Sequence, residues 1–218
     1  MHDYKLIALD LDGTLLNSNK QLSVENAAAL RLASSRGVQI VPTTGRFFDG
    51  MPQVIRALPY LNYAITINGA QVQDLRSGEI VYRAELPLPR ALAILEYLDT
   101  LPVIYDCYCG NWGWMTRAMQ EQAAQFISDP HSLKMVRELR TPVDELKSYL
   151  RARGEAVQKL QLFVKDPSCR PAVMAELERR FPGIAASTSL ANNIELNDAA
   201  ANKGDAVRAL AAHLGLSM

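Results

Sequence analysis

The sequence has little of several features that mark specialised classes of protein. Its 218 residues include three cysteines, Cys107, Cys109 and Cys169, with neither Cys-x-x-Cys spacing nor a dense framework. We therefore expect reduced thiols that pack in the interior rather than bind metal. No apolar run approaches the length of a membrane span, and the start, MHDYKLIALDLD, lacks the long apolar stretch of a signal peptide. These absences predict a cytoplasmic protein without a membrane partner.

An excess of one charge is also absent, because Lys plus Arg equal Asp plus Glu at 23 each. The chain therefore lacks the basic field that collects nucleic acid, and any anion must be held by a local site. The phosphate-binding patterns GxxxxGK[ST] and GxGxxG do not occur, nor does the GxSxG pattern of serine hydrolases. A nucleotide-binding module and a serine hydrolase are thus disfavoured.

Apolar runs that alternate with helical patterns are what the sequence does have, and they predict an α/β protein. KLIALDL is almost continuously apolar, as expected of a parallel strand covered on both faces. SVENAAALRLASSRG predicts a helix capped by Ser23, and VQIVPTTGR and YAITINGA predict two more strands. QVQDLRSGEIVYR predicts a hairpin that turns at Ser77 and Gly78.

The character of the chain changes after about residue 84. A helix is predicted in LPLPRALAILEYLDT, strands in PVIYDCY, WGWMT and SLKMVREL, and helices at 118–127, 142–152 and 171–180. VQKLQLFV alternates polar and apolar residues, which predicts a sheet with one solvated face. IAASTSL and NNIELN follow as strands, and NKGDAVRALAAHLG as a helix capped by Asn202. We predict a Rossmann-like parallel-sheet core formed by residues 1–83 and 185–218, with an inserted α+β cap at 84–184.

Two carboxylates, Asp10 and Asp12, follow the first predicted strand. Side chains two residues apart on a strand point the same way, so both would face the carboxyl edge of the sheet, where α/β proteins bind ligands. Two adjacent carboxylates repel each other and favour a hard cation such as Mg²⁺. One can then attack phosphorus while the other transfers protons, and Gly13 allows a sharp turn beside the phosphate. An Asp-Gly turn without catalytic function is the alternative for this motif alone.

The motif DLDGTLL resembles the first motif of the haloacid dehalogenase (HAD) superfamily of Mg²⁺-dependent phosphohydrolases. The order TTGR at 43–46, NGA at 68–70, a long inserted lobe and NKGDA at 202–206 is similar to its Cof-type sugar phosphatases with a type IIB cap. The resemblance implies that Asp10 is the nucleophile and a metal ligand, and that Asp12 is the acid/base and a metal ligand through its carbonyl. It implies substrate contacts from Leu11, Thr44, Gly45, Arg46, Asn68 and Lys203.

The residues themselves leave simpler readings open for three of these contacts. Lys203 stands in the first turn of a predicted helix, where a cation opposes the helix dipole unless an anion is bound, but it can also be a solvated lysine. Thr44 can instead cap the segment that follows it. Arg46 can instead be a surface or packing residue.

One family motif is not found: the GDxxND-like stretch that supplies another Mg²⁺ ligand after the final helix. The expectation that follows is a metal site short of one carboxylate and an apolar edge strand, LIALDL, that favours self-association. Two functions remain. The first is a Mg²⁺-dependent phosphatase of small phosphorylated metabolites, such as sugar phosphates, that forms an aspartyl-phosphate and uses the inserted lobe as a lid. The second is a truncated, weakly active or inactive phosphate-binding fragment completed by a partner chain.

Four aromatic residues gather in the predicted insertion: Tyr105, Tyr108, Trp112 and Trp114. Aromatic side chains in strands more often pack than stack on a ligand, so packing is favoured over recognition of a sugar ring or a base.

Overall fold

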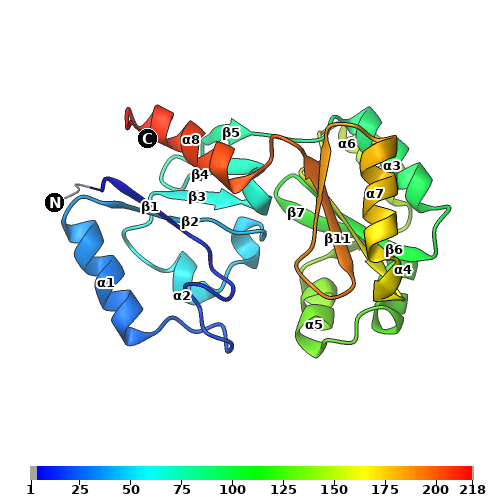
Figure 1. The fold of residues 1–218 in the computed structure, drawn as a ribbon, viewed down its shortest axis with the longest axis horizontal. Coiled ribbons are helices and arrows are strands. Elements are labelled where there is room, and N and C mark those ends of the chain that lie inside the picture. Colours follow the sequence, from blue (N-terminus) through cyan, green and yellow to red (C-terminus); the bar gives the residue numbers. More distant parts are fainter. Residues whose placement is uncertain (1–3, 218) are drawn as a thin grey trace. The chain divides into compact units, whose positions relative to one another are not determined.

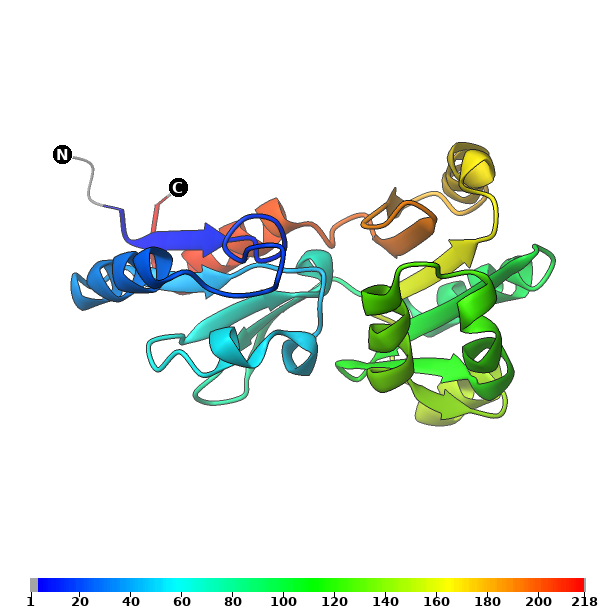
Figure 2. The same ribbon diagram turned by 90° about the horizontal axis from the view of Figure 1, so that it is seen from below.

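The computed structural model describes residues 4–217, which divide into two compact units. The first unit ends at Ala84 and resumes at Ala200, and the second is Glu85–Ala199 (Figure 1). The chain passes between the units twice, once after β5 and once before α8 (Figure 2). None of the helices in the described part of the chain is long and apolar enough to cross a membrane.

Within residues 4–217, the first unit contains five strands and the helices that cover them. Its elements are β1 (Leu6–Leu9), α1 (Val24–Ser35), β2 (Gln39–Pro42), η1 (Phe48–Gly50), α2 (Gln53–Arg56), β3 (Tyr63–Thr66), η2 (Ile67–Gly69), β4 (Gln71–Asp74), β5 (Ile80–Arg83) and α8 (Lys203–His213). β1 and β2 are parallel, and a parallel bridge between Thr43 and Ile65 links β2 to β3. β3, β4 and β5 form an antiparallel meander, which confirms the predicted hairpin.

Helices cover both faces of this sheet, as expected of a Rossmann-like core. Leu30 of α1 and Ile55 of α2 pack with Ile40 on one face. Leu210 of α8 packs with Val41 on the other face, because successive side chains of a strand point to opposite sides. α1 begins where the Ser23 side chain accepts a hydrogen bond from the Asn26 N–H, at 3.1 Å. Figure 1 shows α1 and α2 on one side of β1–β3 and α8 on the other.

Strand β1 lies at the edge of the sheet. Among the strands that the structure describes it pairs with β2 alone, and its four residues are intermediate or exposed rather than buried. This is the edge position expected for LIALDL, and self-association through it stays a prediction.

The second unit is built on a six-stranded sheet with the order β10-β11-β9-β6-β7-β8. Its elements are α3 (Leu88–Leu98), β6 (Val103–Cys109), β7 (Trp112–Thr116), α4 (Arg117–Gln122), η3 (Ala123–Gln125), α5 (Pro130–Glu138), β8 (Thr141–Val143), α6 (Leu146–Arg153), β9 (Lys159–Val164), η4 (Pro167–Cys169), α7 (Arg170–Arg180), β10 (Ile184–Ser187) and β11 (Asn193–Asp198). Helices α3, α6 and α7 pack on one face of the sheet, while α4, η3 and α5 pack against part of the other.

The predicted boundary at residue 184 is wrong. β10 and β11, which were expected in the core, belong to the inserted unit. The physical reason is strand pairing: β11 runs antiparallel to β9, with Ile194 opposite Leu162, and β10 continues the same sheet. The insertion therefore ends at Ala199.

The predicted strand SLKMVREL is also wrong, because these residues lie in helix α5 and the residue after it. The side chain of Asp129 caps the helix by accepting the Ser132 N–H at 2.8 Å, and Pro130 occupies the first turn. Leu133 and Val136, three residues apart, pack against the same apolar cluster.

A third prediction fails at β9, because its polar face is buried rather than solvated. The Lys159 ammonium lies 3.2 Å from the Glu195 carboxylate, and the Arg140 Nε lies 3.1 Å from the Asp106 carboxylate. The ring of Tyr108 has the Lys159 ammonium 4.3 Å and the Arg140 guanidinium 4.6 Å from its centre. We call these five residues the buried charge cluster. Burial raises the pKa of the Asp106 carboxyl, and the two cations oppose that rise.

The aromatic residues of the insertion pack, as favoured. Tyr105 is buried in the main apolar cluster, and Trp114 packs against it with its ring 4.5 Å from that of Tyr149. The indole N–H of Trp112 donates to Thr141.

All three cysteines are free thiols. Cys107 and Cys109 are buried packing residues as expected, whereas Cys169 is exposed, because it lies at the end of the short η4 turn.

Candidate active site

The carboxyl ends of β1, β2 and β3 meet at one edge of the sheet. The Thr43 N–H donates to the Leu9 carbonyl at 2.8 Å, so the ends of β1 and β2 are adjacent. The Thr44 N–H donates to the Ile65 carbonyl at 2.9 Å, which adds the end of β3. Asp10 and Asp12 therefore follow β1 at the edge where open α/β sheets bind ligands.

Asp10 is paired with a residue from the far end of the chain. Its Oδ1 lies 2.6 Å from the Lys203 Nζ, while its Oδ2 accepts a longer hydrogen bond of 3.4 Å from the Thr14 hydroxyl. The two paired side chains are 37% and 43% exposed. Lys203 is the first residue of α8, where a nearby carboxylate offsets the unfavourable effect of a cation on the helix dipole. The fold thus brings together two residues that the family resemblance assigns to one site, although their direct pairing was not predicted.

Asp12 is held by two cations. The Arg46 guanidinium donates to both of its carboxylate oxygens, at 2.8 and 2.9 Å, and the Lys20 ammonium donates to Oδ1 at 2.7 Å. Burial by itself would raise the pKa of Asp12, but the hydrogen bonds and charges of Arg46 and Lys20 outweigh it and lower the pKa to about 2. Asp12 is therefore a carboxylate at neutral pH.

Sequence reasoning missed Lys20. It lies in the loop between β1 and α1 with a φ of 59°, a turn conformation that brings its side chain back toward Asp12. No periodic pattern marks such a residue. The only available signal is a lysine a few residues after the two carboxylates, in a stretch rich in turn-forming residues, NSNK.

The other expected contact residues lie in the same unit. Thr44 is buried, and its hydroxyl accepts the Arg46 N–H at 3.2 Å, which is the local capping role left open above, although the hydroxyl can still donate. Gly45 lies between Thr44 and Arg46 in the chain. The side chain of Leu11 is fully buried in the core, so only its backbone can meet a substrate. The Asn68 N–H donates to the Thr44 carbonyl at 3.0 Å.

The charges of these ion pairs leave the site with a positive excess. Asp10 and Asp12 supply two negative charges, and Lys20, Arg46 and Lys203 supply three positive ones. An anion is therefore the ligand class that this arrangement favours.

A model of the haloacid dehalogenase-like hydrolase family matches residues 7–218. The chain belongs to the haloacid dehalogenase-like hydrolases. The phosphatase YwpJ of Bacillus subtilis is 37% identical over 107 residues, which are 49% of this chain and 37% of that protein. The HMP-PP phosphatase of Cronobacter sakazakii is 28% identical over 216 residues, 98% of this chain and 74% of that protein. For YwpJ and two further phosphatases of B. subtilis, the matched residues span only about a third of the relative's length.

Solved structures show the same fold. A haloacid dehalogenase-like hydrolase from B. subtilis superposes with a TM-score of 0.79 and 26% identity, covering 98% of this chain and 80% of that one. The subclass IIB sugar phosphatase BT4131 superposes with a TM-score of 0.76 and 15% identity, covering 98% and 77%. This chain thus shares its fold, from the core through the inserted α+β unit, with these two hydrolases.

Members of this hydrolase family that are phosphatases generally depend on Mg²⁺. The donors at this edge fit that ion in kind, because carboxylate and carbonyl oxygens are the ligands of a hard cation. They fall short in number: among residues 4–217 no three carboxylate, imidazole or thiolate groups gather closely enough to hold a metal. Both carboxylate oxygens of Asp12 are engaged by cations, which leaves the Asp10 carboxylate and the Asp12 carbonyl as the candidate ligands.

Proposed function

We propose that this chain is a Mg²⁺-dependent phosphatase that hydrolyses small phosphorylated metabolites through an aspartyl-phosphate at Asp10. The observation that carries the proposal is the pairing of Asp10 with Lys203 at the carboxyl end of β1, in a chain of the haloacid dehalogenase-like hydrolase family. A carboxylate beside a fixed ammonium can attack a phosphoryl group while the ammonium neutralises the phosphoryl oxygens.

In the first step the Asp10 Oδ2 attacks phosphorus, since it carries the weaker of the two contacts of this carboxylate. The new bond joins Oδ2 to phosphorus, and the bond between phosphorus and the leaving oxygen breaks. The leaving oxygen takes one proton and departs as an alcohol. Lys203, Thr44 and the backbone of Gly45 would hold the phosphoryl oxygens. Bound Mg²⁺ would supply charge neutralisation between the carboxylate of Asp10 and the phosphoryl group.

In the second step a water molecule attacks phosphorus, the aspartyl bond breaks, and inorganic phosphate leaves with Asp10 restored. Asp12, a carboxylate at neutral pH, has no proton of its own and can accept one from that water. The first step requires Asp12 to donate a proton to the leaving oxygen. A carboxylate held by Arg46 and Lys20 has no proton to give. We infer that a phosphorylated substrate competes for these two cations and frees Asp12 to carry a proton.

The alternative is a chain that binds phosphate with little or no turnover. One observation favours it: the ion pairs of Asp12 with Arg46 and Lys20 are compatible with anion binding but oppose proton donation. The names of the relatives leave the substrate open, since one is a phosphatase of HMP-PP and another of pyridoxal phosphate. A cytoplasmic location also stays a prediction.

The test is release of phosphate from para-nitrophenyl phosphate with and without Mg²⁺. The wild-type chain should show Mg²⁺-dependent turnover, and Asp10→Asn should reduce it to background, because the amide lacks the attacking oxygen and the negative charge. Asp49→Asn is the matched control, since Asp49 is an exposed carboxylate of the same unit that pairs with Arg56. Mg²⁺-dependent turnover that survives in Asp10→Asn would exclude Asp10 as the nucleophile.

A further inference from the structure

Three consecutive residues at the end of β3 have left-handed backbone conformations. Ile67, Asn68 and Gly69 have φ angles of 52°, 63° and 99°. A β-branched residue such as Ile67 rarely adopts a positive φ, and such conformations persist only where surrounding structure imposes them. We call residues 67–69 the strained turn.

The strained turn is attached on one side to the segment that carries Thr44. The Ile67 N–H donates to the Arg46 carbonyl and the Asn68 N–H to the Thr44 carbonyl, both at 3.0 Å. The side chain of Ile67 is completely buried. Two hydrogen bonds and a buried side chain therefore fix the turn against the loop that would hold the phosphoryl oxygens.

On its other side the strained turn touches the start of α8. A Cβ at Gly69 would lie 2.4 Å from the Asn202 carbonyl oxygen and 2.9 Å from the Lys203 nitrogen. These distances are far below contact distance, so the backbone of Gly69 abuts the backbone of α8, and only glycine fits there. Asn202 is the cap of that helix and accepts the Asp205 N–H at 2.8 Å.

The position of the Lys203 ammonium depends on this backbone contact. Its side chain is 43% exposed, and its ammonium lies 2.6 Å from the Asp10 carboxylate. To reach that carboxylate, the first turn of α8, where the side chain begins, must lie at the right distance from the end of β1. The backbone contact with Gly69 restricts where that first turn can lie. The strained turn also holds the Thr44 segment, through the hydrogen bonds of Ile67 and Asn68.

We propose that Gly69 is a positioning residue: through the strained turn it sets Lys203 and the Thr44 segment at the spacing that binds a phosphoryl group. This inference rests on the proposed function, since it assigns phosphate to that pair of segments. Gly69 itself need not touch the substrate. A side chain at this position would push the start of α8 away and carry Lys203 out of reach of an anion held by Thr44.

The test compares Gly69→Ala with Gly78→Ala. Gly78 lies in the turn between β4 and β5 with a φ of 78°, and a Cβ there meets nothing within 4 Å. Both variants therefore gain the strain of a positive φ, but only Gly69→Ala gains the contact with α8. Binding of inorganic phosphate should weaken about tenfold in Gly69→Ala, the loss expected when a hydrogen bond to a charged group is broken, and stay unchanged in Gly78→Ala.

A double-mutant cycle with Lys203→Met separates positioning from general damage to the fold. If Gly69 acts through Lys203, Gly69→Ala should weaken phosphate binding in the wild-type background and have no further effect in the Lys203→Met background. Equal losses in the two backgrounds, or equal affinities of Gly69→Ala and Gly78→Ala, would overturn the inference.

Should Gly69→Ala fail to fold, Asn202→Ala carries the test of how Lys203 is placed, because loss of this cap loosens the first turn of α8 without a side chain at Gly69. Phosphate should bind more weakly to Asn202→Ala than to the wild-type chain, and Asn202→Ala should have no further effect in the Lys203→Met background. Unchanged binding by Asn202→Ala, or an equal loss in the two backgrounds, would also refute the proposal. A wild-type chain that binds phosphate but never hydrolyses para-nitrophenyl phosphate contradicts the proposed function alone. A chain that binds no phosphate contradicts both proposals.

Discussion

Removing Arg140 should destabilise the inserted unit more than any change at an exposed ion pair. The Arg140 and Asp106 side chains are 3% and 0% exposed, so Arg140→Met leaves a fully buried carboxylate without its partner. Arg140 also donates to the Tyr108 hydroxyl at 2.8 Å. Losing one partner of a buried ion pair costs about 3–5 kcal/mol. That is a large share of a typical total stability of about 5–15 kcal/mol.

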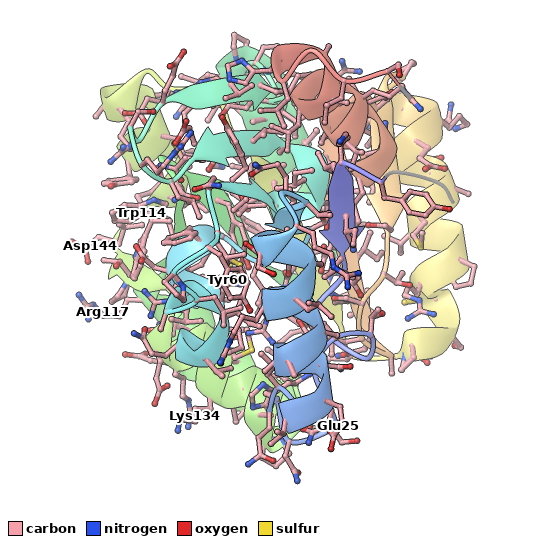
Figure 3. All side chains as sticks on the ribbon, turned by 90° about the vertical axis from the view of Figure 1, so that its left-hand side faces the viewer. Glu25, Tyr60, Trp114, Arg117, Lys134 and Asp144 are labelled. Carbon is pink, nitrogen blue, oxygen red and sulfur yellow. The ribbon has the colours of Figure 1, made fainter. Side chains whose placement is uncertain are left out.

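The assay is urea unfolding followed by tryptophan fluorescence. The two tryptophans of the chain, Trp112 and Trp114, both lie on β7, so the signal reports on the inserted unit. Arg117→Met is the matched control, because Arg117 pairs with Asp144 at 3.9 Å while both are well exposed, and Figure 3 shows both at the surface. This control should change the free energy of unfolding by no more than about 0.5 kcal/mol.

The pH dependence of the stability of Arg140→Met distinguishes a lost ion pair from a cavity. A cavity alone would not change how the stability depends on pH. Burial already raises the pKa of Asp106, and loss of Arg140 raises it further. The folded state then binds a proton that the unfolded state releases, so the stability of the variant falls as pH rises. The cost relative to wild type should therefore be smaller at pH 5 than at pH 8.

A second substitution tests whether the loss is electrostatic. Asp106→Leu in the Arg140→Met background removes both charges and leaves the Lys159 and Glu195 pair balanced. Most of the lost stability should return. A single variant that costs less than about 1 kcal/mol, or a double variant no more stable than the single one, would refute the electrostatic account of the buried charge cluster.

Three further predictions concern the candidate site and its supports. Asp12→Asn should lower turnover more for aryl phosphates with poor leaving groups than for those with good ones, because poor leaving groups need the proton most; equal losses would indicate a structural role. Lys20→Met should raise the pKa of Asp12 from about 2 toward its ordinary value, so the acid limb of the pH–rate profile should move to higher pH. If the limb does not move, Asp12 is not the group whose titration produces it. Asn202→Ala should cost about 1 kcal/mol in urea unfolding monitored by circular dichroism, since it removes the cap of α8, and no loss would mean that the cap is dispensable.

Much of the first unit could be predicted because its signals are local. Ser23 and Asn202 cap the helices that they were expected to cap, and Pro42 ends β2, where its missing N–H does least harm. The family resemblance assigned Asp10 and Lys203 to one site although 193 residues separate them, but it did not predict their ion pair. Lys20 was missed, since a single cation in an irregular loop has no periodic pattern to mark it.

The errors in the second unit come from signals that are not local. IAASTSL and NNIELN were correctly predicted as strands, but alternation along a strand does not say which sheet it joins. Pairing of Ile194 with Leu162 decides that, and it joins residues far apart in sequence. SLKMVREL was mistaken for a strand because the helix start, Asp129 and Pro130, lies just before that stretch.

The buried face of β9 shows why alternation predicts a face but not its environment. Lys159 and Gln161 alternate with leucines, a pattern that fits solvent on one side equally well. The deciding residue is on another strand: β11 carries Glu195, which lies opposite Gln161 in register and within 3.2 Å of the Lys159 ammonium. A lysine and a glutamate on two neighbouring alternating strands can satisfy each other and remain buried. Complementary charges on two such strands are therefore the sequence feature that would distinguish a buried polar face from a solvated one.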